Sequence, residues 1–161
     1  MSNIGKLISG FRVFKSTTLP QKKDVIRHLL AQGHKPSTMV ISCVDLRISA
    51  SEIFAASPGE LYVINNIGGL VPKYDTAGVH GILSAIEYAV TELKVDNIVV
   101  LGHAKCDSMR MMMSDAFTAS KNGLSESMKT WLSVAEAART SVKDQLSEMD
   151  EEQQQESCGR E

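Results

Sequence analysis

Three short runs rich in β-branched residues alternate with helical patterns along the middle of this chain. The runs are STMVISC (37–43), LYVINN (61–66) and NIVVLG (97–102), each bounded by polar or turn-forming residues, as buried strands usually are. Between the last two, apolar positions from Gly78 to Leu93 follow one face of a helix. Strands that alternate with helices predict parallel pairing, so we expect an α/β fold in three layers: a central, mostly parallel β-sheet flanked by helices.

Further helical patterns lie on both sides of this alternation. Residues 20–33 have apolar positions at helical spacing and end on a glycine, while DSMRMMMSDAFTAS (107–120) predicts one helix and Ser125 opens a longer one. From about residue 147 the chain becomes acidic and glutamine-rich, which predicts a polar, partly disordered tail. The length is typical of one domain, so we expect residues 1–161 to form a single domain.

Composition argues against several kinds of partner. The chain has 17 Lys and Arg against 19 Asp and Glu, which gives a net charge of −2. It has no stripe of basic residues of the kind that binds nucleic acid. No apolar run approaches the roughly 20 residues of a membrane span, and no secretory leader is evident, so we expect a cytoplasmic protein without a membrane partner. Three cysteines do not suggest a disulfide framework, and Cys158 is interpreted as a solvated thiol in the tail.

Pairs of potential metal ligands follow two of the predicted strands. Cys43 and Asp45 end the first strand, and His103 and Cys106 follow the third. Because carboxyl ends of parallel strands meet at one edge of a sheet, the two pairs are expected to lie together, and their donor atoms suit zinc. Taken singly, each pair more often has a purely structural role; a C-x-D pair, for example, is more often a buried thiol near a capping carboxylate. The combination favours a metal site.

The same residues resemble the signature of the β-class carbonic anhydrases, C-x-D-x-R followed by H-x-x-C. The matching residues are Cys43, Asp45, Arg47, His103 and Cys106. The stretches PGELYVINNIGGLVPKYD and HGILSAIEYAVTELKVDNIVVLGH are also similar to the second strand, long helix and third strand of that family. The resemblance covers about half of the chain, from Gly33 to Met113.

The resemblance implies a zinc enzyme, a lyase (carbonate dehydratase) that reversibly hydrates carbon dioxide to bicarbonate and a proton. Cys43, His103 and Cys106 would be permanent Zn²⁺ ligands. Asp45 would either take the fourth position or leave it to water while paired with Arg47, and both Asp45 and Arg47 would be catalytic. We expect Asp45 to rest off the metal, because two thiolates and a carboxylate around Zn²⁺ would acidify bound water poorly.

Three further positions are expected to bind substrate by the same likeness. Tyr62 and Tyr88 fall where the family places aromatic walls of the substrate cleft, and His34 falls where a glutamine is usual. Each also has a structural interpretation: Tyr62 as a core residue of the second strand, Tyr88 as a packing residue of the long helix, and His34 as an exposed loop residue.

Several residues depart from the family pattern. Asp107 and Ser108 stand where two glycines usually follow the second cysteine, and Asp107 adds a negative charge near the metal. Asn65 and Val40 replace an arginine and a tryptophan that help form an inhibitory bicarbonate site in one allosteric subgroup, so we expect that site to be absent. Leu46 replaces a common serine.

The chain also stops where family members usually continue into another helix and strand. We therefore expect it to lack the C-terminal edge strand, and we expect a homodimer or higher homo-oligomer with a reduced subunit interface. Four hypotheses remain open from the sequence: an active carbonic anhydrase, a catalytically silent or truncated zinc-binding relative, a redox or metal-sensing module, and a hydrolase of carbon disulfide or carbonyl sulfide on the same fold.

Overall fold

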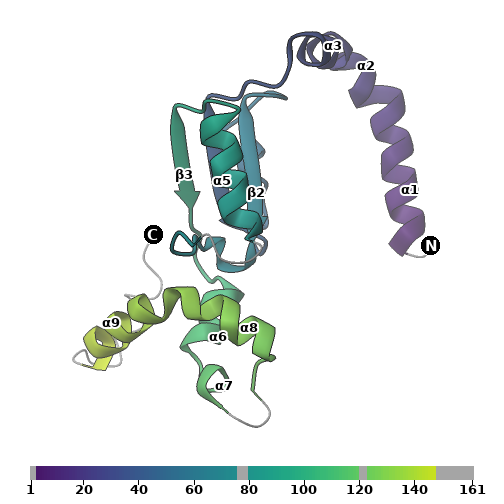
Figure 1. The fold of residues 1–161 in the computed structure, drawn as a ribbon. Coiled ribbons are helices and arrows are strands. Elements are labelled where there is room, and N and C mark those ends of the chain that lie inside the picture. Colours follow the sequence, from purple (N-terminus) through teal and green to yellow (C-terminus); the bar gives the residue numbers. More distant parts are fainter. Residues whose placement is uncertain (1–2, 76–79, 120–122, 148–161) are drawn as a thin grey trace.

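A parallel β-sheet forms the centre of the computed structural model, which describes residues 3–75, 80–119 and 123–147. Within these residues the sheet has three strands in the order β2-β1-β3. The strands are β1 (Thr38–Cys43), β2 (Leu61–Asn66) and β3 (Asn97–Leu101). Cys43 pairs with Asn66, and Ser42 pairs with Leu101, so all three strands end at one edge. The predicted strands and their parallel pairing are confirmed (Figure 1).

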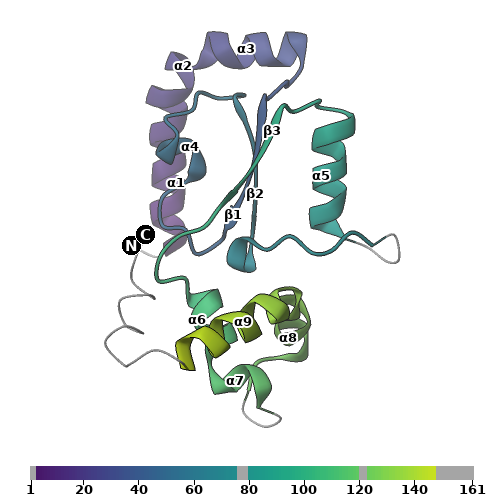
Figure 2. The ribbon, with the colours of Figure 1, turned by 90° about the vertical axis from the view of Figure 1, so that its left-hand side faces the viewer.

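Helices lie on both faces of this sheet (Figure 2). The helix α5 (Gly81–Thr91) lies on one face, where Ala89 packs against the fully buried Met39 and Ile41 of β1. On the other side lies the short helix α4 (Ala50–Ile53), which begins with a complete capping box between Ser49 and Glu52. The three-layer α/β arrangement expected from the sequence is therefore correct.

A group of helices packs beneath the carboxyl edge of the sheet. It comprises α6 (Asp107–Met113), α7 (Asp115–Thr118), α8 (Glu126–Leu132), a 3₁₀ turn η3 (Ser133–Ala135) and α9 (Glu136–Ser147). Met112, Phe117 and Leu132 form its buried core. Trp131 Nε1 donates a hydrogen bond of 2.7 Å to the carbonyl of Ile67, which joins this helical group to the turn that follows β2.

The prediction of one continuous helix over residues 107–120 is wrong. Ser114 has an extended backbone (φ −78°, ψ 163°) that separates α6 from α7. This break in the helix directs the side chain of Phe117 into the buried core, where it packs with Leu132. Packing of apolar side chains therefore outweighs the helical propensity of the methionine-rich run.

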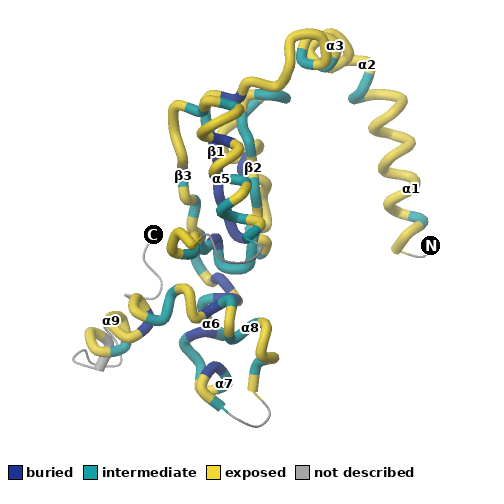
Figure 3. Tube along the Cα trace, viewed as in Figure 1, coloured by how far each residue is buried: buried dark blue, intermediate teal, exposed yellow. Residues whose placement is uncertain are grey.

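The N-terminal helices stand away from the sheet as an arm. They are α1 (Asn3–Val13), a π-helical segment η1 (Phe14–Thr18), α2 (Leu19–Gln21) and α3 (Lys23–Gln32). Figure 3 shows that α1 is exposed along almost its whole length, and none of its residues is buried. Large apolar side chains such as Leu7 and Phe11 are more than 60% exposed. The helix α3 lies within the helical pattern predicted over residues 20–33, whereas α1 was not predicted.

Other expectations concern edges and termini. Among the described residues β3 pairs only with β1. No helix in the described part of the chain is both long and apolar enough to cross a bilayer. The tail predicted from about residue 147 lies outside the described residues, and the single-domain organisation stays a prediction.

Candidate metal centre

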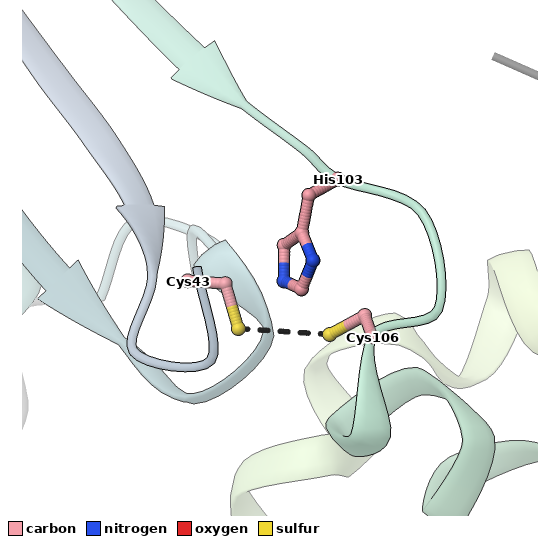
Figure 4. Close-up of side chains that lie close together, drawn as sticks. All are labelled: Cys43, His103 and Cys106. Atoms are coloured by element: carbon pink, nitrogen blue, oxygen red, sulfur yellow. Dashed lines mark hydrogen bonds between the residues drawn. The ribbon is translucent and has the colours of Figure 1, made fainter. Parts of the chain in front are cut away.

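Two strand ends and one tight turn bring three ligand atoms together. Cys43 is the last residue of β1, and His103 follows the end of β3. Lys105 then adopts a left-handed backbone (φ 52°), which is unusual for a residue with a side chain. This turn folds the chain so that Cys106, at the N-cap of α6, faces the histidine and Cys43 (Figure 4).

The geometry of this group suits a tetrahedral metal ion. The Sγ atoms of Cys43 and Cys106 lie 3.6 Å apart, and the ligand atoms of Cys43, His103 and Cys106 all lie within 4.8 Å of one another. Two thiolates bound to Zn²⁺ at their usual distances would be about 3.8 Å apart. The three side chains can therefore close around an ion of this size with little movement.

The imidazole of His103 is oriented for ligation. Its Nδ1 lies 3.0 Å from the carbonyl oxygen of Ala104, so Nδ1 carries the proton and donates. Its Nε2 is buried without a hydrogen-bond partner of acceptable geometry, although the neighbouring Cys43 sulfur is close enough to raise the pKa of His103. A buried acceptor without a partner is costly, and a metal ion would satisfy it.

Hydrogen bonds prepare one of the two thiols for ligation. Burial by itself would raise the pKa of Cys43, but His103 and the backbone N–H groups of Asp45 and Gly68 lower it to about 7. The Asp45 N–H donates to the sulfur over 3.3 Å. Burial and the neighbouring Cys43 raise the pKa of Cys106 instead. One thiolate is thus available near neutral pH, and the second requires a cation or a higher pH.

Asp45 lies beside the group but is not part of it. Its Oδ1 is 3.5 Å from Nη2 of Arg47, and its Oδ2 accepts a hydrogen bond of 3.0 Å from the backbone N–H of Asp107. The structure therefore brings together all five residues of the sequence signature. It places three of them as a ligand group and the other two as an ion pair next to it.

Two glycines that the sequence interpretation did not single out support this arrangement. Gly68 and Gly69 belong to the 3₁₀ turn η2 (Ile67–Gly69) after β2, and both have positive φ angles. A Cβ atom at Gly69 would lie 3.4 Å from the backbone nitrogen of Cys43, an ordinary contact distance, so the left-handed backbone of Gly69 (φ 62°) is what favours glycine there. The backbone of Gly68 contributes a hydrogen bond to the Cys43 sulfur. Consecutive glycines directly after a predicted strand were the available signal for a turn with positive φ angles.

The three predicted substrate residues lie far from the ligand group of the same chain. The rings of Tyr62 and Tyr88 contact each other, with centroids 6.2 Å apart, and Tyr62 also packs against the core beneath α5. Tyr62 pairs with Met39 near the start of β1, four residues (~13 Å) before the level of Cys43. His34 is exposed and precedes β1. All three therefore lie toward the amino edge of the sheet.

An apolar pocket of about 590 Å³ lies at the carboxyl edge instead. Val44, Ile67, Ile82 and Trp131 are among the residues that line it, together with His80 at the start of α5. Val44 directly follows Cys43 in the chain. This pocket was not predicted from the sequence, because Trp131 reaches it from a helix 64 residues beyond Ile67.

Comparison with known proteins agrees with the sequence signature. Residues 38–161 match the protein family described as carbonic anhydrase. The chain is 36% identical over 146 residues to "Carbonic anhydrase" of Synechococcus elongatus (88% of this chain, 50% of the relative). It is 29% identical over 160 residues to "Beta carbonic anhydrase 3" of Arabidopsis thaliana (98% of this chain, 60% of the relative). The chain thus spans half to three-fifths of the length of these curated relatives.

Solved structures extend the comparison to the fold. The β-carbonic anhydrase CcaA superposes with a TM-score of 0.84 at 28% identity, covering 98% of this chain and 74% of that one. One of two β-carbonic anhydrases of Sordaria macrospora, both described as tetrameric, superposes with a TM-score of 0.72 at 26% identity, covering 94% of this chain and 72% of that one.

Proposed function

The chain belongs to the β-carbonic anhydrase family, and on that premise we propose that it is a zinc-dependent enzyme interconverting carbon dioxide and bicarbonate. The observation that carries this proposal is the group of Cys43, His103 and Cys106, whose ligand atoms lie within 4.8 Å of one another. The buried, unpartnered Nε2 of His103 supports a metal ion as the missing partner. Two sulfurs and one imidazole nitrogen favour zinc over hard cations such as Mg²⁺ or Ca²⁺.

In this proposal the three ligands leave one coordination position for the reaction. Zinc, when bound there, supplies a Lewis acid that lowers the pKa of a water molecule toward neutrality. Cys43 and Cys106 bind as thiolates and balance the charge of the ion. Cys43 is the better prepared of the two, since its pKa is already about 7 without the ion.

Asp45 and Arg47 control access to the fourth position. Arg47 and the N–H of Asp107 each hold one oxygen of the Asp45 carboxylate, which keeps this group beside the centre and out of the ligand set. The held carboxylate can accept a hydrogen bond from the reacting oxygen, and so orient it. Release of these contacts would let the carboxylate move toward the ion.

The apolar pocket beside Val44 suits the uncharged substrate. Carbon dioxide carries no net charge and no hydrogen-bond donor, so apolar walls such as Ile67, Ile82 and Trp131 can accept it without a desolvation cost. Val44, which lines the pocket, directly follows Cys43, so the pocket lies at the same edge of the sheet as the ligand group.

A second copy of the chain would complete the site. His34, Tyr62 and Tyr88 lie toward the other edge of the sheet, so they can contact substrate only at the metal centre of a partner. The exposed apolar side chains of α1 offer a surface for such an assembly, since large apolar patches on one protomer usually become interfaces. The tetrameric relatives from Sordaria macrospora support this proposal.

The test is stopped-flow hydration of carbon dioxide by protein of quantified zinc content, from neutral to alkaline pH. Zinc-dependent turnover that rises with pH would support the enzyme. Zinc-loaded protein with no rate above buffer would favour the second candidate, a catalytically silent zinc-binding relative. This second candidate is supported by the sequence, because Asp107 and Ser108 stand where the family usually has two glycines.

A further inference from the structure

Asp107 is the least expected residue at this site, and the structure gives it a specific partner. Both Nε and Nη2 of Arg110 donate to its Oδ1, over 3.1 Å and 2.9 Å. The two residues lie three apart on α6, where side chains of one helical face meet. The negative charge that replaces a family glycine is therefore paired within its own helix.

The same residue contacts the catalytic carboxylate through its backbone. The N–H of Asp107 donates to Oδ2 of Asp45 over 3.0 Å, while its own carboxylate bonds to Arg110. Arg47 lies near the other oxygen of Asp45. A chain of contacts thus runs from Arg110 through Asp107 and Asp45 to Arg47, with a guanidinium at each end.

We propose that Arg110 is a positioning residue that makes an aspartate tolerable at position 107 of this metal centre. The inference rests on the proposed function, because it concerns how the centre stays open for water. By binding the Asp107 carboxylate, Arg110 neutralises its charge and prevents it from binding the ion next to Cys106. Because Arg110 binds the Asp107 carboxylate, Arg47 pairs with Asp45 only. One carboxylate, that of Asp45, then faces the open coordination position.

Loss of Arg110 has a defined consequence in this scheme. The free Asp107 carboxylate would compete with Asp45 for Arg47 or would approach the ion as an additional oxygen ligand. Either change lowers turnover, and the second raises the affinity for the metal. Neither change follows if the pair only stabilises the surface of α6, because an exposed pair of this kind adds little to stability.

The experiment compares wild-type protein with Arg110→Gln, Arg110→Lys and the double variant Arg110→Gln with Asp107→Asn. A matched control is Arg27→Gln, which removes an exposed pair of the same spacing from α3 (Arg27–Asp24, 3.0 Å). The readouts are carbon dioxide hydration, zinc affinity in competition with a chelator, and the visible spectrum of cobalt-loaded protein, which reports the number and kind of ligands.

We expect Arg110→Gln to lower kcat about two- to fivefold, the range that corresponds to the coupling of one exposed charge pair. Its cobalt spectrum should shift toward higher coordination, and its zinc affinity should increase. The double variant should regain the wild-type spectrum and most of the rate, and Arg110→Lys should regain part of it. Arg27→Gln should match the wild type in all three readouts.

Two outcomes would overturn the inference. One is an Arg110→Gln protein with the kcat, spectrum and zinc affinity of the wild type. The other is a loss that the second substitution, Asp107→Asn, does not restore. Failure of the proposed function is distinct, because the wild type itself would then bind no zinc or show no turnover. A wild type that binds metal but is inactive still tests the inference through its cobalt spectrum.

Discussion

Cys43 and Cys106 are separated by 63 residues in the chain, yet their Sγ atoms lie 3.6 Å apart at the carboxyl edge of the sheet. Parallel strands produce this proximity, because β1 and β3 both end at that edge. A different local structure positions each cysteine: Cys43 is the last residue of a strand, and Cys106 follows a left-handed turn. The fold therefore assembles this centre from separate segments and not from one local motif. Each ligand can be tested by its own substitution.

Replacing Cys106 by serine should remove the metal. Losing a supporting partner of a ligand commonly weakens metal binding 10–100-fold, so losing a thiolate ligand should cost more than about 100-fold in zinc affinity. The measurement is zinc content after dialysis, with competition by a chromophoric chelator. Cys158→Ser is the control and should keep its zinc. Stoichiometric zinc with unchanged stability in Cys106→Ser would show that the assigned site is wrong.

Asp45→Asn should separate metal binding from turnover. An amide cannot make the same ion pair with Arg47, so we expect a loss of at least about 100-fold in kcat/KM with most of the zinc retained. Asp24→Asn, which changes an exposed carboxylate on α3, should leave the rate unchanged. Full activity in Asp45→Asn would remove this residue from the mechanism. A structure of the zinc-loaded protein near pH 8 with Asp45 on the metal would contradict the resting state that we predict.

The two thiols of the metal-free protein should titrate at different pH. Ultraviolet thiolate absorbance should rise in one step near pH 7 from Cys43 and in another above pH 9 from Cys106. The pKa of Cys43 is lowered from 9.0, so its stabilisation of the fold is present above pH 9 and is lost as pH falls through about 7. The measurement uses Cys158→Ser as background, and Cys43→Ser should abolish the lower step. A single step near the ordinary thiol pKa would contradict the assignment.

Mixing two inactive variants should restore activity if the site is shared between copies. Cys106→Ser lacks the metal, and Tyr88→Ala lacks a substrate-binding side chain. Random exchange into dimers leaves about one quarter of the sites intact, because only one site of each mixed dimer combines a metal from one copy with Tyr88 from the other. The measurement is activity after refolding the two together, with each refolded alone as control. No recovery, with mixed dimers verified by mass, would place the tyrosine's role elsewhere.

Trp131→Phe should loosen the helical group from the sheet. The substitution removes the hydrogen bond to the Ile67 carbonyl and leaves that acceptor unsatisfied, which should lower the free energy of unfolding by about 1–2 kcal/mol. Urea denaturation of the metal-free protein measures this change. Ser133→Ala, which loses an exposed bond to the Thr130 carbonyl, should change stability by less than about 0.5 kcal/mol. Equal effects of the two substitutions would mean that Trp131 does not anchor the group.

The sequence by itself determined the elements with the strongest local patterns. β2 coincides with the predicted LYVINN, and β1 and β3 differ from prediction by one residue at an end, because runs of β-branched residues between turns have few alternatives. The alternation of strands and helices then predicted parallel pairing. Parallel pairing in turn predicted that Cys43 and Asp45 lie near His103 and Cys106, at the carboxyl edge of the sheet. The chemistry of these side chains was sufficient to predict a metal site.

The tertiary structure decided what depends on distant neighbours. The break at Ser114, the contact of Trp131 with Ile67 and the pocket that it lines arise from apolar packing between segments far apart in the chain. The same is true of Asp45, whose carboxylate is held by Arg47 and by a backbone N–H 62 residues away. The partner of Asp107 was close in sequence, at Arg110, but only the folded turn of α6 shows which way that carboxylate is directed. Local patterns specify elements because they depend on backbone preference and periodicity, whereas side-chain direction and pocket shape depend on packing that only the folded chain provides.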